Sequence, residues 1–132
     1  MIYTQKKPIR LVIEGNIGSG KSTLLSILKK TLNISIVPEP VKKWQNVMDS
    51  GNILDLFYKD IKRWSYTFQS YAFITRIKTI IEHEKQFLSS GNSIQLLERS
   101  IYSDRFCFAK NCYESRQMSS LEWHMYTCLL YT

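Results

Sequence analysis

The stretch Gly15-Asn16-Ile17-Gly18-Ser19-Gly20-Lys21-Ser22 fits the phosphate-binding pattern G-x-x-x-x-G-K-[ST] at each fixed position. Its glycines allow a tight turn in which consecutive backbone N–H groups point inward at a phosphate. Lys21 adds positive charge beside the β and γ phosphates, and the Ser22 hydroxyl is a hard oxygen suited to Mg²⁺. We therefore expect a nucleotide-binding loop made of Gly15, Asn16, Ile17, Gly18, Ser19, Gly20, Lys21, Ser22 and Thr23.

Both flanks of this loop have the context that the motif requires. Residues Arg10–Glu14 form a short β-branched run, which predicts a buried strand. Residues Ser22–Leu32 carry leucine and isoleucine at helical spacing. Strand, loop and helix in this order predict an α/β fold with a parallel sheet. They argue against the alternative, a glycine-rich turn with a solvated lysine.

Composition favours a soluble globular protein. The chain has 132 residues, of which 44% are hydrophobic, enough for the core of one domain. No apolar run reaches membrane-spanning length, and the start of the chain does not resemble a signal peptide, so we expect no membrane partner and a cytoplasmic location by default. The net charge of +7 is spread along the chain in blocks no longer than a pair, so nucleic acid is the weaker interpretation.

The cysteines do not form a recognisable metal or disulfide pattern. Cys107, Cys112 and Cys128 are odd in number and contain no C-x-x-C pair, and only His83 and His124 could join them. We expect three reduced thiols that are mostly buried, and no zinc site.

A second short strand over Ile34–Val37 ends at Pro38-Glu39-Pro40. Each proline restrains the residue before it, so Glu39 lies on a stiff extended segment. In an open α/β sheet, ligands lie beyond the carboxyl ends of the strands, which makes Glu39 a candidate general base. The alternative, a surface glutamate in a proline turn, is equally compatible with the sequence.

The segment Ile53–Leu88 contains neither proline nor glycine and predicts helix, in one piece or two. Tyr58, Gln69 and Arg76 are spaced by eleven and seven residues, so one continuous helix would place all three on the same side. This polar stripe is either a binding face or the solvated face of an amphipathic helix.

A third buried strand is expected over Ser93–Leu97, and Glu98 and Arg99 follow it. A carboxylate there could hold Mg²⁺ or its waters, and an adjacent arginine could bind anionic oxygens. Three strands would thus deliver the loop, Glu39 and the Glu98-Arg99 pair to one edge of a sheet. Further helices are expected over Trp44–Met48, Ile101–Asn111 and Ser119–Leu130.

With these motifs placed, the chain resembles the deoxyribonucleoside kinases, and within that family the deoxycytidine and deoxyguanosine kinases most closely. The resemblance runs from about Ile9 to Tyr126. It rests on several spaced motifs: Ile13–Thr23, Val37–Val41 with Trp44, Arg63–Gln69 with Tyr71, Ala72 and Arg76, Glu98–Arg105, Asn111, Tyr113–Ser115 and Glu122-Trp123. The resemblance implies a P-loop kinase-type fold, an ATP donor with Mg²⁺, and a role in deoxynucleoside salvage.

The resemblance also implies roles for individual residues. Glu39 would take the proton from the nucleoside 5′-hydroxyl, with Arg99 beside it and Lys21 at the phosphates, while Ser22 and Glu98 would handle Mg²⁺. The deoxynucleoside would be contacted by a further set: Tyr58 at the sugar 3′-hydroxyl, Gln69 at the base edge, and Trp44, Phe68, Phe108 and Ile17 around the base.

Base preference follows from the chemistry of Asp104 beside Arg76. A carboxylate is a hydrogen-bond acceptor, which suits the exocyclic amine of cytosine or adenine but not O4 of thymine. The pattern also resembles that of the cytidine and purine kinases. We therefore expect deoxycytidine as the preferred substrate, with purine deoxynucleosides as further substrates.

Family members continue for two further strands, an arginine-rich lid and an adenine-binding loop. We therefore expect residues 1–132 to be one incomplete kinase domain with three strands and an uncovered apolar sheet edge. The likeness is expected to stop after Tyr126. The resemblance implies a homodimer. Alternatives are a non-catalytic nucleotide-binding remnant, a dimerisation partner of a full-length kinase and, less compatible with the motifs, a regulatory ATPase or GTPase.

Overall fold

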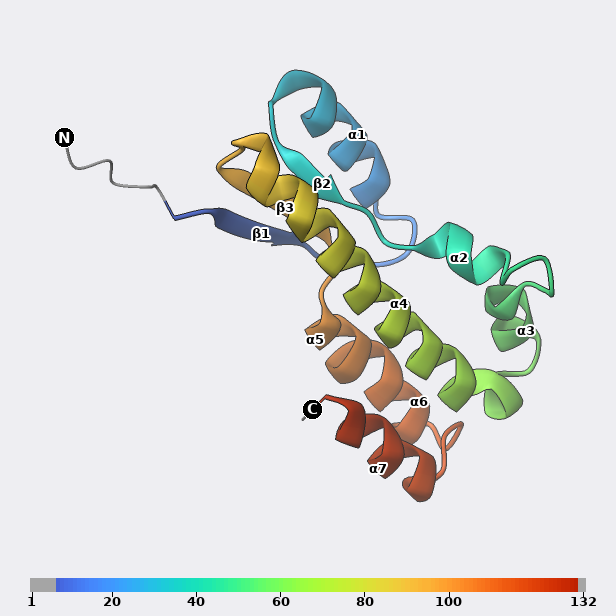
Figure 1. Cartoon of the computed structure of the whole chain (residues 1–132). Coiled ribbons are helices and arrows are strands. Elements are labelled where there is room, and N and C mark those ends of the chain that lie inside the picture. The colour runs from blue at the N-terminus through green and yellow to red at the C-terminus, as the bar shows by residue number, and fades with distance from the viewer. Residues whose placement is uncertain (1–6, 131–132) are drawn as a thin grey trace. The chain divides into compact units, whose positions relative to one another are not determined.

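The computed structural model describes residues 7–130, which form two compact units. Unit 1 comprises residues 7–39 and 78–100, and unit 2 comprises residues 40–77 and 101–130. The elements follow in the order β1 (Ile9–Ile13), α1 (Lys21–Thr31), β2 (Ser35–Val37), α2 (Val41–Gln45), α3 (Ile53–Lys59), α4 (Ile61–Ser90), β3 (Ile94–Glu98), α5 (Ile101–Ser103), the π-helix η1 (Asp104–Ala109), α6 (Lys110–Glu114) and α7 (Ser120–Leu129) (Figure 1).

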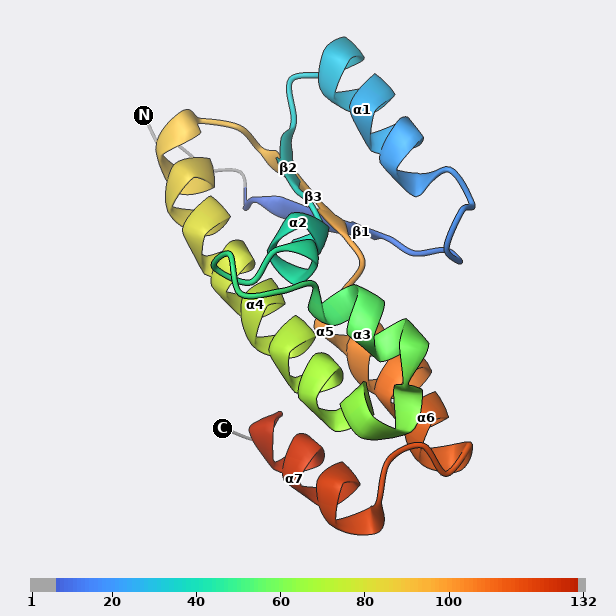
Figure 2. The same ribbon diagram turned by 90° about the vertical axis from the view of Figure 1, so that its right-hand side faces the viewer.

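Unit 1 contains a parallel sheet with the strand order β1-β3-β2. Ile13 is in register with Glu98, and Val37 with Leu97, so the three strands end at the same edge. Helix α1 and the second half of α4 lie on opposite faces of the sheet (Figure 2). The predicted α/β fold with three parallel strands is confirmed. The segments that follow the three strands therefore lie at the same edge of the sheet.

Strand β1 forms the outer edge of this sheet and is poorly covered. Among the described residues it pairs with β3 alone, and the side chains of Ile9, Leu11 and Val12 are 53%, 49% and 44% exposed. An apolar strand edge of this kind offers unpaired backbone groups to a further strand. The predicted uncovered apolar edge is therefore present.

Gln95 is the second residue of the central strand β3 and is fully buried. Neither its amide oxygen nor its amide nitrogen has a hydrogen-bond partner among the described residues. Burying an unpaired amide costs free energy, because the water that solvated it is lost without replacement. Gln95 therefore weakens the centre of the sheet.

Replacing Gln95 by leucine is expected to raise the free energy of unfolding by about 1–2 kcal/mol, since it removes an unpaired polar group without emptying the site. Urea denaturation measures the effect. Gln86 is an exposed glutamine of α4, and Gln86→Leu is the matched control, expected to change stability by less than about 0.5 kcal/mol. If Gln95→Leu were less stable than the unaltered protein, the Gln95 amide would have a hydrogen-bond partner in solution.

Unit 2 is helical, and α3, α4 and α7 begin at capping side chains. Asn52 accepts a hydrogen bond from the backbone N–H of Asp55 at the start of α3, and Ser119 forms a capping box with Glu122 at the start of α7. Asp60 separates α3 from α4 and accepts from the N–H of Arg63. The predicted long helix is thus present in two pieces.

An aromatic core holds the first part of unit 2 together. The Phe68 ring stacks on Phe57 with 4.7 Å between centroids and meets the edge of Trp44 at 5.4 Å. Helix α2 carries Trp44 and begins directly after Pro40, three residues earlier than predicted. The T-shaped and stacked contacts add to the free energy of burial and fix the rings in place.

The helices after β3 form a nearly continuous run over residues 101–114, with η1 in its middle, and run antiparallel to the first half of α4 (Figure 1). The prediction for the cysteines was partly wrong here. All three are free thiols, but Cys107 and Cys128 are exposed and only Cys112 is buried. Cys107 follows the exposed Phe106 on η1, and Cys128 follows the exposed Met125 by about one turn on α7, so both cysteines lie on open faces of their helices.

Within residues 7–130, no helix combines the length and apolar character needed to cross a membrane.

Candidate functional site

The glycine-rich loop joins the end of β1 to the first residue of α1, as the motif requires. Gly18 and Gly20 have φ angles of 76° and 93°. Residues with a Cβ rarely adopt this backbone conformation. Lys21 donates from Nζ to the carbonyl of Asn16 at 2.9 Å, so its ammonium lies over its own loop. The loop is therefore shaped to receive an anion, and its lysine charge is already beside it.

Glu98, the last residue of β3, joins two other parts of this edge. Its Oε1 accepts a hydrogen bond from the Ser22 hydroxyl at 2.9 Å, and its Oε2 accepts from the backbone N–H of Glu39 at 3.3 Å. A hydroxyl and a carboxylate this close are the hard oxygen donors that Mg²⁺ prefers. Among the described residues no group of three acidic, histidine or cysteine side chains forms a complete metal site. The pair thus suits an ion whose remaining ligands are phosphate oxygens and water.

Arg99 follows Glu98 and binds Glu39. Its Nη1 lies 3.0 Å and 3.1 Å from the two carboxylate oxygens of Glu39, and Nη2 donates to the carbonyl of Gly15 at 3.1 Å. The two side chains are only 8% and 9% exposed. The alternative that Glu39 is a solvated surface glutamate is therefore wrong.

The backbone of Arg99 is strained, with a φ angle of 60° in the left-handed region. For a residue other than glycine this costs about 1–2 kcal/mol. Its N–H still donates to the carbonyl of Ile13 at 2.9 Å, so the strain turns the side chain without breaking the sheet. Strain of this kind persists where surrounding contacts over-determine it, as the Glu39 and Gly15 contacts do here.

Unit 1 therefore brings together the residues that the sequence assigned to phosphate chemistry. The loop, Glu39, Glu98 and Arg99 all follow strands that end at one sheet edge, and hydrogen bonds link each of them to another. The contact from Arg99 to the Gly15 carbonyl was not predicted, because no sequence pattern specifies which backbone carbonyl an arginine meets.

Unit 2 buries the polar residues of α4. Gln69 and Arg76 are each 3% exposed, so the alternative of a solvated helix face is wrong. Asp104, at the start of η1, is also 3% exposed, and its Oδ2 accepts from Arg76 Nε at 2.6 Å. Charged groups are rarely this buried unless they are paired. Arg76 and Asp104 meet this condition, because each is the buried partner of the other.

Further contacts hold these side chains in position. The Trp44 indole N–H donates to the Thr75 hydroxyl at 2.8 Å, and the Arg76 guanidinium lies 5.9 Å from the centre of the Trp44 ring. Gln69 makes a weak contact with the Cys112 sulfur at 3.9 Å. Burial raises the pKa of the Cys112 thiol, although the Gln69 amide partly offsets this, so the thiol is neutral at pH 7. Sequence reasoning missed Thr75 and Cys112, which carry no motif.

The single continuous helix that would align Tyr58 with Gln69 and Arg76 is not present. Tyr58 lies on α3, and the break at Asp60 separates it from the helix that carries Gln69 and Arg76, so one continuous helix does not align the three. Its side chain is 56% exposed, with the ring tilted against Phe57 at 5.3 Å.

The residues expected around the base have different environments. Trp44 and Phe68 are in the aromatic core, whereas Phe108 is half-buried on η1. Ile17 belongs to the loop of unit 1, where its side chain is exposed.

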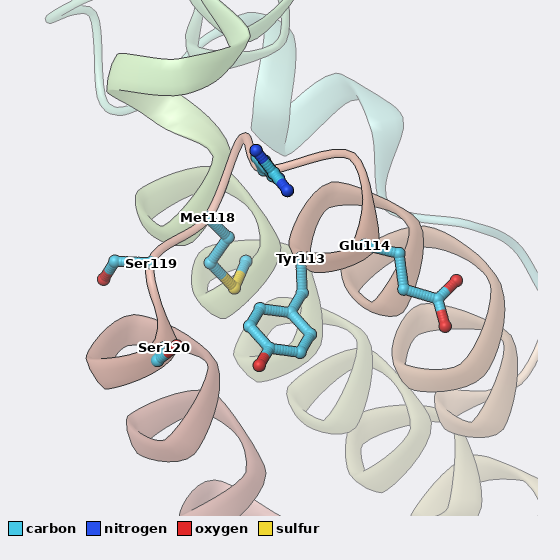
Figure 3. A pocket seen from close by; sticks show the side chains of 6 residues that line it. Tyr113, Glu114, Met118, Ser119 and Ser120 are labelled. Atoms are coloured by element: carbon cyan, nitrogen blue, oxygen red, sulfur yellow. The ribbon is translucent and has the colours of Figure 1, made fainter.

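A separate open hollow of about 510 Å³ lies at the turn between α6 and α7. Its walls include Tyr113 and Met118, and Figure 3 shows the Glu114 carboxylate pointing away from the Tyr113 ring. None of the residues predicted from the sequence to bind substrate lines this hollow, and we assign it no role in chemistry.

Comparison with known proteins agrees with this geometry. The sequence model of the deoxynucleoside kinase family matches residues 11–131. The chain is 41% identical to the mitochondrial deoxyguanosine kinase of Xenopus laevis, across 89% of this chain and 49% of that protein. It is 40% identical to deoxycytidine kinase 1 of Xenopus laevis and 39% identical to human deoxycytidine kinase, across 89% of this chain and 50% and 51% of those proteins.

The match corrects one expectation from the sequence. The likeness was expected to stop after Tyr126, but the family match continues to residue 131. The chain spans about half the length of the curated relatives that it matches. Family match, identity, and the phosphate-binding loop beside Glu39, Glu98 and Arg99 agree, and this chain belongs to the deoxynucleoside kinase family.

Proposed function

We propose that this chain phosphorylates deoxynucleosides, transferring the γ-phosphate of ATP to the 5′-hydroxyl. The observation that carries the proposal is the contact of Arg99 Nη1 with both carboxylate oxygens of Glu39, at the sheet edge that also bears the phosphate-binding loop. An acceptor hydroxyl needs a base, and a phosphate needs positive charge and inward-facing N–H groups. Unit 1 supplies all three.

In this proposal Glu39 accepts the proton of the 5′-hydroxyl as the oxygen attacks. A carboxylate offers about four lone-pair sites, so the contacts with Arg99 leave Glu39 able to accept a further hydrogen bond. Arg99 keeps the carboxylate oriented and adds positive charge near the attacking oxygen. Lys21 stabilises the negative charge on the transferred phosphate.

Ser22 and Glu98 are the residues that would hold Mg²⁺, because their oxygens already lie within hydrogen-bond distance of each other. When bound, the ion would neutralise part of the charge on the β and γ phosphates. Glu98 has a second function, since it also fixes the backbone of Glu39. One carboxylate would thus position the metal and the base together.

We assign base recognition to unit 2, where Gln69, Arg76 and Asp104 are buried polar groups. Asp104 would accept a hydrogen bond from an exocyclic amine, and Gln69 would pair with the base edge. Thymine presents O4, an acceptor, at the corresponding position, and a carboxylate would repel it. Deoxycytidine is therefore the preferred substrate in this proposal, followed by purine deoxynucleosides.

Transfer of label from [γ-³²P]ATP to a panel of four deoxynucleosides tests the proposal. Labelled monophosphate should form with deoxycytidine fastest and with thymidine slowest. Binding of nucleotide and nucleoside without transfer would instead support the non-catalytic alternative. Release of labelled phosphate in the absence of any deoxynucleoside would support a regulatory ATPase.

We also propose a homodimer that uses α7. Leu121, Met125 and Cys128 are spaced by four and three residues, and all three are exposed, which gives α7 an apolar outer stripe. Changing Leu121 and Met125 to glutamate should convert a dimer to a monomer in sedimentation velocity experiments. Met48→Glu is the matched control, because Met48 is 92% exposed and lies outside the stripe. A monomeric unaltered chain would contradict this proposal.

A further inference from the structure

Tyr126 on α7 is a fully buried tyrosine whose hydroxyl has no hydrogen-bond partner among residues 7–130. Buried polar groups are nearly always hydrogen-bonded, because leaving one unpaired forfeits its interaction with water. Phenylalanine would fill the same space without this cost. The hydroxyl therefore needs an explanation that packing does not provide.

The position of Tyr126 relates it to the buried ion pair of unit 2. Its ring meets Phe73 at 6.1 Å and also packs in one cluster with Ala109. Phe73 lies three residues before Arg76 on α4, about one helical turn away. Ala109 lies five residues after Asp104 on η1, the i→i+5 spacing of hydrogen-bonded residues in a π-helix. Tyr126 thus packs on both elements that supply the ion pair.

The chemistry of the neighbourhood selects Asp104 as the partner of the hydroxyl. Burial raises the pKa of Tyr126, and the negative charge of Asp104 raises it further. The phenol therefore keeps its proton at neutral pH and can donate a hydrogen bond. A guanidinium has only donors, whereas a carboxylate accepts hydrogen bonds on both oxygens. A donor facing a carboxylate forms a charge-assisted hydrogen bond, which is stronger than a neutral one.

We propose that Tyr126 is a positioning residue for base selection, whose hydroxyl donates to the Asp104 carboxylate when a deoxynucleoside is bound. Arg76 Nε already engages Oδ2 of Asp104 at 2.6 Å. With Tyr126 as a further donor, the carboxylate has a fixed orientation, and one of its oxygens faces the exocyclic amine of the base. This inference rests on the proposed function, because it assumes that Asp104 reads the base.

The test is Tyr126→Phe in the full chain, with deoxycytidine and thymidine affinities measured by isothermal titration calorimetry. The ratio of the deoxycytidine to the thymidine affinity should fall about tenfold, while the thermal midpoint stays the same or rises because an unpaired hydroxyl has been removed. Tyr102→Phe is the control, since Tyr102 is an exposed tyrosine of α5. If the role of Tyr126 were purely structural, Tyr126→Phe would lower the thermal midpoint and weaken the binding of deoxycytidine and thymidine equally.

The same change in an Asp104→Asn background provides a second test. If Tyr126 acts through the carboxylate, Tyr126→Phe should leave the affinity ratio unchanged in that background. An unchanged ratio in the otherwise unaltered chain would overturn the inference alone. Failure of the unaltered chain to bind either nucleoside would overturn the proposed function, and the inference with it.

Discussion

Glu39→Gln is expected to lower the rate of phosphoryl transfer by about 10²–10⁴-fold, the usual contribution of a general base. Glutamine has nearly the same shape, but its amide does not accept the proton of the 5′-hydroxyl. The affinity for ATP should be unchanged, because the phosphate-binding loop keeps its glycines and Lys21. Single-turnover transfer to deoxycytidine and equilibrium ATP binding, measured on the same preparation, separate the two effects.

Glu114→Gln is the matched control for this substitution. Glu114 lies on α6 with a side chain that is 62% exposed and an i,i+4 contact to Lys110. Such surface pairs contribute about 0–1 kcal/mol to stability, so neither folding nor transfer should change. If the Glu39 and Glu114 variants transferred phosphate equally fast, Glu39 would not be the base.

Removing Asp104 alone is expected to destabilise the protein by about 3–5 kcal/mol, because the buried Arg76 guanidinium would lose its carboxylate partner. Asp104→Leu in urea denaturation measures this loss. Arg76→Leu combined with Asp104→Leu removes both charges and should recover most of the stability, as replacing a whole buried ion pair by apolar residues often does.

The same double variant should also use thymidine better than the unaltered chain does. Without a carboxylate facing O4, the repulsion against thymine disappears, and leucine can contact its methyl group. A panel of deoxynucleosides assayed with both proteins shows the change. Thymidine as the best substrate of the unaltered chain would contradict the assignment of Asp104 and Arg76 to base selection.

Local patterns were sufficient to predict the three strands and the first helix. The glycine motif, the β-branched strand before it and the leucines after it specify a strand, a loop and a helix within 23 residues, from Ile9 to Thr31. The prolines around Glu39 and the acid at the end of β3 allowed a shared sheet edge to be predicted, because parallel strands end at the same edge. These signals are short-range and depend on backbone chemistry.

Properties that depend on distant residues were not predictable in this way. The bond from Arg99 to the Gly15 carbonyl joins residues 84 positions apart, and its geometry depends on a left-handed backbone at Arg99 that no propensity indicates. Cys107 is exposed on the open face of η1, a π-helix that no local pattern indicated. Tyr58 does not share a helix with Gln69 and Arg76 because a single residue, Asp60, ends one helix and caps the next.

The most direct test of the account is the chemical position of the transferred phosphate. Incubation of the chain with ATP, Mg²⁺ and deoxycytidine, followed by ³¹P nuclear magnetic resonance, distinguishes a 5′-monophosphate ester from inorganic phosphate. The signal of deoxycytidine 5′-monophosphate should grow in step with the ADP formed. Inorganic phosphate as the only product, at a rate independent of deoxycytidine, would contradict it.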